Sequence, residues 1–202
     1  MSKVDGIRWR LTTALAKLWH GQAVSIGRNV RFLGLPIISG TAFGKITIGA
    51  RASLVSDPRG TALGVRGPVI LRLMTQGAQI DIGEDAGLSG TVICAAKSVR
   101  IGARCLIGAD VMIFDTDFHN PEPEGRRYAA PDWDRVSAPV SIGDDVFIGT
   151  GSRVMKGVTI GEGCVIGAGS LVVSDIAPFT VAAGSPARAL RPVERLEPKV
   201  PA

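Results

Sequence analysis

Residues 142–177 read, when written in sixes, IGDDVF IGTGSR VMKGVT IGEGCV IGAGSL VVSDIA. Every block opens with Ile or Val, and its fifth place holds a small or β-branched residue. Gly stands second in four of the six blocks. A period of six fits neither a helix nor a plain alternating strand, and a short fixed repeat is typical of a solenoid. The stretch predicts short strands separated by sharp bends, where Gly supplies positive φ or close backbone approach.

The composition fits a narrow coil of this kind. At 202 residues, the chain is long enough for one domain with a substantial core. Hydrophobic residues make up 46% of the chain, aromatic residues only 5%, and Gly occurs 26 times. A narrow β interior takes Ile, Val, Leu and small residues, and its corners take Gly. An all-β solenoid is therefore expected.

The blocks resemble the hexapeptide repeats of the left-handed parallel β-helix acyltransferases. The resemblance implies that three hexapeptides make one triangular coil, that the first residue of each points inward, and that coils stack. It also implies the left-handed winding, which the spacing does not show and which opposes the usual right-handed crossover. The expected fold is a left-handed parallel β-helix with an N-terminal helix and one long extruded loop.

The expected organisation has three parts: an N-terminal helix over 1–21, the β-helix over 22–177 and an extended C-terminal tail over 178–202. Within the β-helix, residues 56–68 break the repeat and indicate a turn or a small outward loop. Five prolines after residue 177 favour extended or turn structure there.

The N-terminal segment has apolar residues at helical spacing over residues 3–20. We favour a helix that caps the end of the coil stack, because a solenoid needs covered ends. A weak membrane-surface contact is the alternative, since Trp9 and Trp19 accompany several cations. The sequence shows no secretory or membrane-spanning pattern, so a cytoplasmic protein is expected.

Neither the charge pattern nor the cysteines indicate nucleic-acid binding or a metal site. The net charge of +5 and the pI of about 9.5 would suit an anionic partner. The basic residues are scattered, however, rather than clustered with aromatic ones as nucleic-acid binding requires. Cys94, Cys105 and Cys164 all fall at inward places of the repeat. Buried thiols without a redox or metal role are therefore expected.

The repeat is interrupted between Ile113 and Ile142 and then resumes. The intervening loop, about residues 115–139, holds four Pro, many charges and one of the chain's two His. A loop this long in a compact regular domain is usually functional. It must leave the coil and return to it near one point.

His119 is the expected catalytic residue of this loop, in the segment DTDFH that begins at Asp115. If the strand continues, Asp115, Asp117 and His119 share one face, with two carboxylates beside an imidazole. Transfer of an acyl group to a hydroxyl needs a base, and His has a suitable pKa. A carboxylate can also fix its tautomer. A surface His that caps a turn is the alternative, and which Asp would orient His119 stays open.

Over about residues 80–191 the chain is similar to the galactoside, maltose and polysaccharide O-acetyltransferases of the hexapeptide family. The motifs are DTDFHNP, SIGDDVFIG, VTIGEGCVIGAGSLV and VAAGSPARALR. The resemblance implies that His119 is the general base that deprotonates a sugar hydroxyl, which attacks acetyl-CoA directly. It also implies that the backbone N–H of Thr150 stabilises the thioester oxyanion.

The same resemblance implies where acetyl-CoA lies and how the chains assemble. The pantetheine arm lies in a groove between subunits, and basic residues near the C-terminus meet the CoA phosphates. The expected assembly is a homotrimer with active sites between subunits, and no metal is expected. The cofactor-binding positions carried over are Phe147, Gly149, Gly167, Ala168, Ser170, Arg188 and Arg191.

Departures from the family pattern bear on the substrate. Phe147 stands where the family often has Trp, so an apolar wall is kept and an indole donor is lost. The doubled Asp before His119 looks like enzymes that act on polysaccharide or lipopolysaccharide sugars, so a glycan precursor is the expected acceptor rather than an antibiotic.

Three other readings compete with O-acetyl transfer. An N-acyltransferase acting on an amino-sugar nucleotide stays open, because it needs the same donor and base. A non-catalytic β-helix scaffold or glycan-binding module is the alternative of another class. A γ-class carbonic anhydrase is disfavoured, because only His20 and His119 are present and the spacing of its metal ligands is missing.

Overall fold

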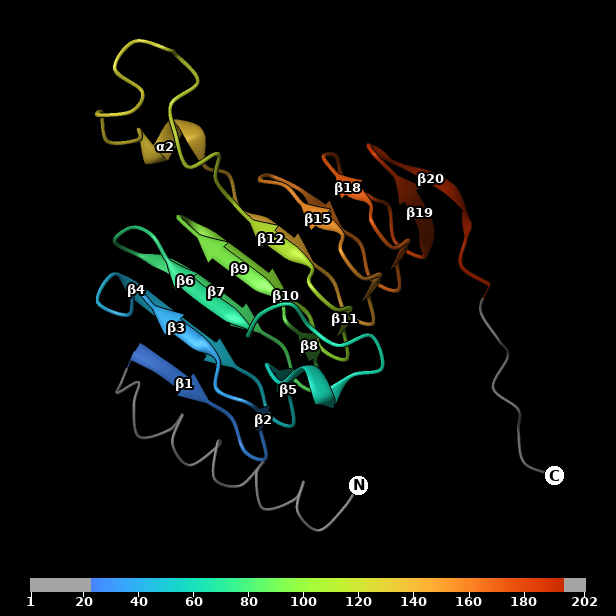
Figure 1. Cartoon of the computed structure of the whole chain (residues 1–202). Coiled ribbons are helices and arrows are strands. Elements are labelled where there is room, and N and C mark those ends of the chain that lie inside the picture. The colour runs from blue at the N-terminus through green and yellow to red at the C-terminus, as the bar shows by residue number, and fades with distance from the viewer. Residues whose placement is uncertain (1–22, 195–202) are drawn as a thin grey trace, which may run out of the picture.

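The protein is a three-sided left-handed parallel β-helix, described by a computed structural model over residues 23–194 (Figure 1). The N-terminal helix expected over 1–21, with His20 and its two Trp, lies outside the described residues. So does the end of the expected tail, from residue 195 on. In the range that the structure covers, no helix is both long and apolar enough to span a membrane.

Three sheets form the three faces. Sheet A contains β1 (Val24–Ile26), β4 (Gly44–Ile48), β7 (Ala78–Ile82), β10 (Ser98–Ile101), β13 (Val140–Ile142) and β16 (Thr159–Ile160). Sheet B contains β2 (Arg31–Leu33), β5 (Ser53–Val55), β8 (Gly87–Ser89), β11 (Leu106–Ile107), β14 (Phe147–Ile148), β17 (Val165–Ile166), β19 (Thr180–Gly184) and β20 (Ala187–Pro192). Sheet C contains β3 (Ile37–Ser39), β6 (Ile70–Leu73), β9 (Val92–Ala95), β12 (Met112–Phe114), β15 (Arg153–Val154) and β18 (Leu171–Val172).

The core consists of columns of like residues stacked from coil to coil. From β1 to β18 successive strands join sheets A, B and C in turn, so each coil has three sides. Both the first and the fifth places of the blocks point inward, and each buried side chain packs on its equivalent one coil away. At these two places of the repeat stretch the buried residues are Ile142, Val146, Ile148, Ser152, Val154, Val158, Ile160, Cys164, Ile166, Ser170, Val172 and Ile176.

The prediction that Cys94 points inward is wrong by one residue. In sheet C the inward Ile113 pairs with Ile93, and Phe114 pairs with Cys94. Ile93 is fully buried, whereas Cys94 is half-buried on the outer side of the strand. The coil shortens by one residue before Ile93 and lengthens after it, and a one-residue slip moves a side chain to the other face.

The other two cysteines are core thiols, as predicted. Cys105 and Cys164 are fully buried and unpaired. Burial raises the pKa of the Cys105 thiol to about 11, and it also raises the pKa of the Cys164 thiol. Thiols that stay protonated in an apolar core are poor nucleophiles, so they act as packing residues.

Two backbone features form the corners of the coil, one at the second and one at the fourth place of the six-residue block. The second-place Gly allows close backbone approach: a Cβ at Gly149 would lie 2.5 Å from the Ala168 backbone nitrogen of the next coil. The fourth place takes the left-handed conformation, with Asp145 at φ 58° and Gly151 at φ 69°. The expectation that Gly marks the bends is confirmed, and at the second place it is coil stacking that requires it.

Replacing Gly149 by Ala is expected to destabilise the protein by about 1–3 kcal/mol, because an added methyl group must push the backbone of the next coil. Thermal unfolding should show a midpoint lowered by several degrees. Gly67→Ala is the matched control, since a Cβ there meets nothing within 4 Å. An unchanged midpoint for Gly149→Ala would show that the coils separate more freely than the stacking suggests.

Two insertions leave the coil. Residues 56–68 form the small outward loop predicted from the sequence, with the 3₁₀ helix η2 (Pro58–Gly60). Residues 115–139 project from the solenoid between β12 and β13 and carry the short helix α2 (Trp133–Val136) (Figure 1). The coil then continues in register, with Val140 paired to Val99.

The segment from 178 is not a separate extended tail over its described length. β19 adds parallel to β17 and extends sheet B, and β20 pairs antiparallel with β19. The inward Ala182 and Ala187 are buried. Pro178, Pro186 and Pro192 fit because they stand outside the parallel ladder, where no N–H is needed. The hairpin therefore belongs to the solenoid.

Candidate active site

The base of the long loop is closed by backbone pairing. Thr116 and Ser137 form an antiparallel bridge, the Asp117 N–H donates to the Val136 carbonyl (3.1 Å), and the Ala138 N–H donates to the Asp115 carbonyl (2.9 Å). The loop therefore leaves and re-enters the coil at one braced point.

Asp115 anchors this point from inside. Its carboxylate is fully buried and accepts the backbone N–H groups of Ala96 and Lys97, each at 2.6 Å. Burial raises the pKa of the Asp115 carboxyl, while the N–H groups act in the opposite direction. The predicted face shared by Asp115, Asp117 and His119 is wrong: β12 ends at Phe114, and only the latter two side chains are exposed.

Asp117 is paired with a lysine rather than with the histidine. Its Oδ2 lies 2.5 Å from Lys156 Nζ, which also donates to the Val136 carbonyl at 3.1 Å. Lys156 follows β15 on the neighbouring coil. This ion pair therefore fixes the loop to the body of the solenoid.

His119 lies at the end of a tight turn. Phe118 has a left-handed backbone (φ 64°), its N–H donates to Thr116 Oγ1 (3.2 Å), and its ring lies 5.5 Å from that of Phe114. The His119 side chain is exposed and makes no hydrogen bond to any residue that the structure describes. The turn thus presents an imidazole whose two nitrogens are free to act on a ligand.

The outer part of the loop is held by a second set of polar contacts. Asn120 Oδ1 accepts the Asp132 N–H (2.8 Å), and Asn120 Nδ2 donates to the Ala130 carbonyl (3.3 Å). Glu122 and Arg135 form a two-point ion pair at 2.6 and 2.7 Å, which lowers the pKa of the Glu122 carboxyl to about 2. These contacts give the outer part of the loop a defined conformation.

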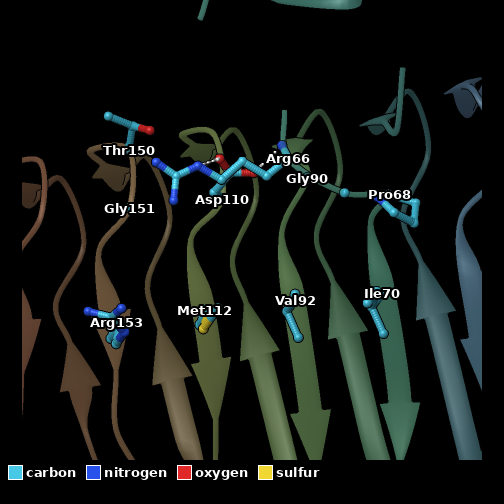
Figure 2. Close-up of a pocket in the computed structure, with 11 residues that line it drawn as sticks. Arg66, Pro68, Ile70, Gly90, Val92, Asp110, Met112, Thr150, Gly151 and Arg153 are labelled. Atoms are coloured by element: carbon cyan, nitrogen blue, oxygen red, sulfur yellow. Dashed lines mark hydrogen bonds and ion pairs between the residues drawn. The ribbon is translucent and has the colours of Figure 1, made fainter. Parts of the chain in front are cut away.

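Thr150 lies at the corner where sheet B passes into sheet C. Its hydroxyl donates to the Ala109 carbonyl (2.7 Å), and its own backbone N–H donates to no acceptor in the described part of the chain. Thr150 stands at one end of a groove of about 570 Å³ (Figure 2). The groove is lined by Arg66, Gly67, Pro68, Ile70, Gly90, Val92, Asp110, Met112, Thr150, Gly151 and Arg153.

The corner continues from Thr150 along the solenoid axis toward the C-terminal coils. The Gly169 N–H donates to the Thr150 carbonyl, and Ala168 beside it is exposed. Gly167 lies just before it, with its carbonyl accepting the hydroxyls of Ser152 and Ser170. The exposed backbone at Ala168 forms a path that a chain-like ligand could follow.

Three of the predicted cofactor-binding residues do not face this corner path. Ser170 is buried, and its hydroxyl bonds Gly167 and Gly184, so it supports the corner from inside. Gly149 is also buried and donates to the Ile166 carbonyl. Phe147 is 46% exposed on sheet B, where it lines a smaller groove of about 160 Å³ with Leu106.

Arg188 and Arg191 lie on β20 at the C-terminal end of the solenoid. Both are exposed, and their guanidinium groups donate only to the carbonyls of Ala187 and Pro192 among the described residues. They leave positive charge at this end without an acidic partner in the part of the chain described.

One chain does not bring His119 and Thr150 together. β12 and β15 are parallel and paired, so Thr150 precedes its strand on one edge of sheet C, and the His119 loop follows its strand on the other. Thr150 is level with Ala109, six residues before Asp115, which corresponds to at most about 20 Å of strand. The two predicted catalytic groups therefore lie on opposite edges of one face.

Sequence reasoning missed four polar residues that shape the site: Arg66, Asp110, Arg153 and Lys156. Arg153 could have been found, because it occupies an outward place of the repeat three residues after Thr150. Nothing in the sequence links Lys156 to Asp117, which stands 39 residues away. No cluster of three or more His, Cys, Asp or Glu side chains that could hold a metal occurs within residues 23–194.

A stack of hexapeptide coils with one extruded loop defines the class of left-handed β-helix proteins. Residues 139–174 match the family model described as bacterial transferase hexapeptide (six repeats), and residues 98–113 match the hexapeptide repeat of succinyl-transferase. These matches show hexapeptide repeats of the kind found in bacterial transferases over both stretches of the chain.

One curated protein and two solved structures illustrate the similarity. Nodulation protein L of Rhizobium meliloti (strain 1021) is 42% identical over 113 residues, which cover 55% of this chain and 59% of that protein. The match thus spans little more than half the length of that relative.

The two solved structures share the fold over most of both chains. One is a point mutant of AntD, an N-acyltransferase from Bacillus cereus, in complex with dTDP and coenzyme A. It has a TM-score of 0.67 and 20% identity, and the match covers 91% of this chain and 89% of that one. The other is a maltose O-acetyltransferase from Clostridium difficile 630, with a TM-score of 0.55, 21% identity and coverage of 96% and 90%. At such identities these structures establish the fold alone.

Proposed function

We propose that this protein is an acetyl-CoA-dependent O-acetyltransferase that acts on a sugar hydroxyl of a polysaccharide, lipopolysaccharide or glycan precursor. The observation that carries the proposal is the braced turn that presents His119 without an internal hydrogen-bond partner among the described residues. A histidine held in place but left free at both nitrogens suits proton transfer better than structural support. The proposal places the protein in the cytoplasm, where its free thiols would stay reduced.

His119 acts as the general base in this proposal. It takes the proton of the acceptor hydroxyl as that oxygen bonds to the carbonyl carbon of the thioester. Negative charge then develops on the thioester oxygen, and in this proposal the Thr150 N–H, which has no acceptor among the described residues, donates to it. When the carbon–sulfur bond breaks, the CoA thiolate takes the proton back from the imidazolium. The reaction is balanced without a covalent enzyme intermediate or a metal.

Acetyl-CoA is the donor substrate, and the corner path beyond Thr150 is where it would lie. The thioester end would sit at Thr150, and the pantetheine arm would run past Gly167 and the exposed Ala168. Arg188 and Arg191 would meet the phosphates at the C-terminal end of the solenoid, since guanidinium groups pair well with phosphate.

The outer face of sheet C supports assembly into a homotrimer. Its central row is apolar except at Arg153: Ile37, Ile70, Val92, Met112, Arg153 and Leu171. The corresponding row of sheet A is entirely polar: Ser25, Thr47, Asp81, Arg100, Ser141 and Thr159. A contiguous apolar face on a chain of this size indicates a protein contact.

A threefold arrangement with sheet C facing the axis would also complete the site. A ring of identical chains uses two different edges at each contact. The edge that carries Thr150 in one chain would lie beside the edge that carries the His119 loop in the next. This arrangement explains why one chain keeps the two groups apart.

N-acyl transfer to an amino-sugar nucleotide is the second candidate. It is favoured by the fold similarity to AntD, an N-acyltransferase whose structure holds dTDP and coenzyme A. The same base and the same oxyanion donor would serve an amine acceptor. An acceptor panel that contains matched hydroxyl and amino sugars distinguishes the two reactions.

The proposal is tested by measuring free thiol release from acetyl-CoA with a panel of sugars and sugar nucleotides, together with CoA binding by calorimetry. Acceptor-dependent release supports the transferase. Absence of both release and CoA binding would contradict it and would favour a scaffold or glycan-binding module.

Replacing Lys156 by Met is expected to lower kcat by up to about 100-fold with little change in KM, because the Asp117 pair holds the loop and a small displacement of His119 is costly. Lys156→Arg should restore most of the rate. Lys45→Met is the matched control, an exposed lysine of sheet A. A rate that Lys156→Arg fails to restore would contradict the positioning role.

A further inference from the structure

The groove beside Thr150 contains two guanidinium groups that would not contact acetyl-CoA in the proposed arrangement. Arg66 comes from the loop 56–68, and Arg153 comes from the outer face of β15 (Figure 2). In the proposed arrangement the CoA phosphates lie at the far end of the pantetheine arm, beyond Ala168. The Thr150 end is where the acyl group meets the acceptor, so these cations face the acceptor.

The loop that supplies Arg66, residues 56–68, is held against the corner of the coil beside the groove. The Val69 N–H donates to Ser56 Oγ at the base of the loop (3.0 Å). At Gly90 (φ 55°) a Cβ would lie 2.8 Å from the Cβ of Val65, so glycine lets the loop lie close to the corner. The position of Arg66 is therefore set by the backbone around it.

Asp110 holds Arg66 without neutralising the whole groove. Its Oδ1 accepts the Arg66 backbone N–H (2.9 Å), and its Oδ2 lies 3.8 Å from the Arg66 guanidinium Nε. Figure 2 shows the Arg66 side chain extending across Asp110 toward Thr150. Arg153 has no acidic partner among residues 23–194. The two arginines and the one aspartate leave a net positive charge beside Thr150.

The floor of the groove is apolar. Ile70, Val92 and Met112 lie side by side on β6, β9 and β12. They belong to the row of sheet C that faces the neighbouring chain in the proposed trimer, so the groove and its acceptor would lie between two chains. The arrangement of a flat apolar floor with cations at its rim suits a sugar ring, whose C–H face packs on apolar side chains while an acidic substituent meets the rim. Guanidinium groups bind carboxylate and phosphate with two parallel hydrogen bonds.

We propose that the acceptor is an acidic sugar whose carboxylate or phosphate is bound by Arg153 and Arg66. The inference rests on the proposed transferase function, because it assigns the groove on the N-terminal side of Thr150 to the acceptor of that reaction. A carboxylate-bearing sugar and a sugar phosphate share this chemistry, and the acceptors in the test distinguish them.

The test compares matched acceptors with the wild type, Arg153→Gln and Arg66→Gln. Methyl glucoside is compared with methyl glucuronoside and glucose 1-phosphate, and the galactose series is compared in the same way. Thiol release from acetyl-CoA gives kcat/KM, and calorimetry gives the binding of each sugar and of CoA. Arg100→Gln is the matched control, an exposed arginine on sheet A.

The wild type is expected to prefer one acidic series over its neutral partner by roughly 10-fold or more, as a charge-assisted hydrogen bond provides. Arg153→Gln should lower the ratio of kcat/KM for the acidic sugar to that for the neutral sugar by roughly 10- to 100-fold, while CoA binding stays unchanged. Arg66→Gln should act in the same direction.

Two results would overturn the inference. One is equal use and equal binding of acidic and neutral partners throughout the panel. The other is an acidic preference that survives both arginine substitutions. CoA binding separates these results from a failure of the proposed function: a protein that binds no CoA is not the proposed transferase, whereas acidic-sugar binding that Arg153→Gln abolishes would keep the anion site.

Discussion

Replacing His119 by Ala is expected to reduce acceptor-dependent acetyl-CoA turnover by about 10²–10⁴-fold, the usual contribution of a general base. The loss should fall on kcat and kcat/KM together, because the imidazole acts in the transition state rather than in donor binding. CoA affinity measured by calorimetry should stay unchanged. The fold should also be unaffected, since His119 is exposed and bonds to nothing in the described part of the chain.

Glu124→Ala is the matched control for this variant, an exposed residue of the same loop. It should retain the wild-type rate. A His119→Ala protein that keeps more than a tenth of the wild-type rate would show that another group removes the proton, although the fold would stand.

Charging the apolar face of sheet C is expected to dissociate the trimer and remove most of the activity. Ile37 and Val173 lie on its first strand and just after its last, and they are 45% and 46% exposed in the single chain. Aspartate at both places should leave the chain folded, but burying the charges against a partner costs several kcal/mol. Assembly should therefore weaken by roughly 100-fold or more.

Sedimentation or light scattering measures this directly. The wild type should show three times the mass of one chain, and the Ile37→Asp/Val173→Asp variant should show a single chain with low turnover. Thr159→Asp puts the same charge on the polar face of sheet A and should stay trimeric. Full activity in a monomeric variant would show that each chain carries a whole site.

Much of the solenoid could be predicted because the six-residue repeat shows which side chains point into the core. The first and fifth places from Ile142 to Ile176 are buried throughout. The error at Cys94 arose because the spacing of inward residues is shorter before Ile93 and longer after it, so the two changes nearly cancel in the sequence. Only the pairing of Ile93 with Ile113 reveals the shift. The C-terminal hairpin was missed because its prolines dominate the local pattern, while its place in sheet B depends on distant strands.

The site was harder to predict, because its contacts join residues far apart in sequence. The alternation rule placed Asp115 beside His119, but the strand ends one residue earlier and the carboxylate turns inward to Ala96 and Lys97. Asp117 forms its ion pair with Lys156, and Asp110 accepts the backbone N–H of Arg66 beside the groove. Such pairs follow from the coil register and cannot be read from local spacing.

The most direct test of a site shared between chains is crosslinking of a His119→Cys/Thr150→Cys protein with a short bis-maleimide. Within one chain the two positions lie on opposite edges of sheet C, with up to about 20 Å of strand between them. A shared site predicts covalent dimers and trimers, which neither His119→Cys nor Thr150→Cys alone should form. Crosslinks confined to single chains, or none in a protein that still has the trimer mass, would contradict it.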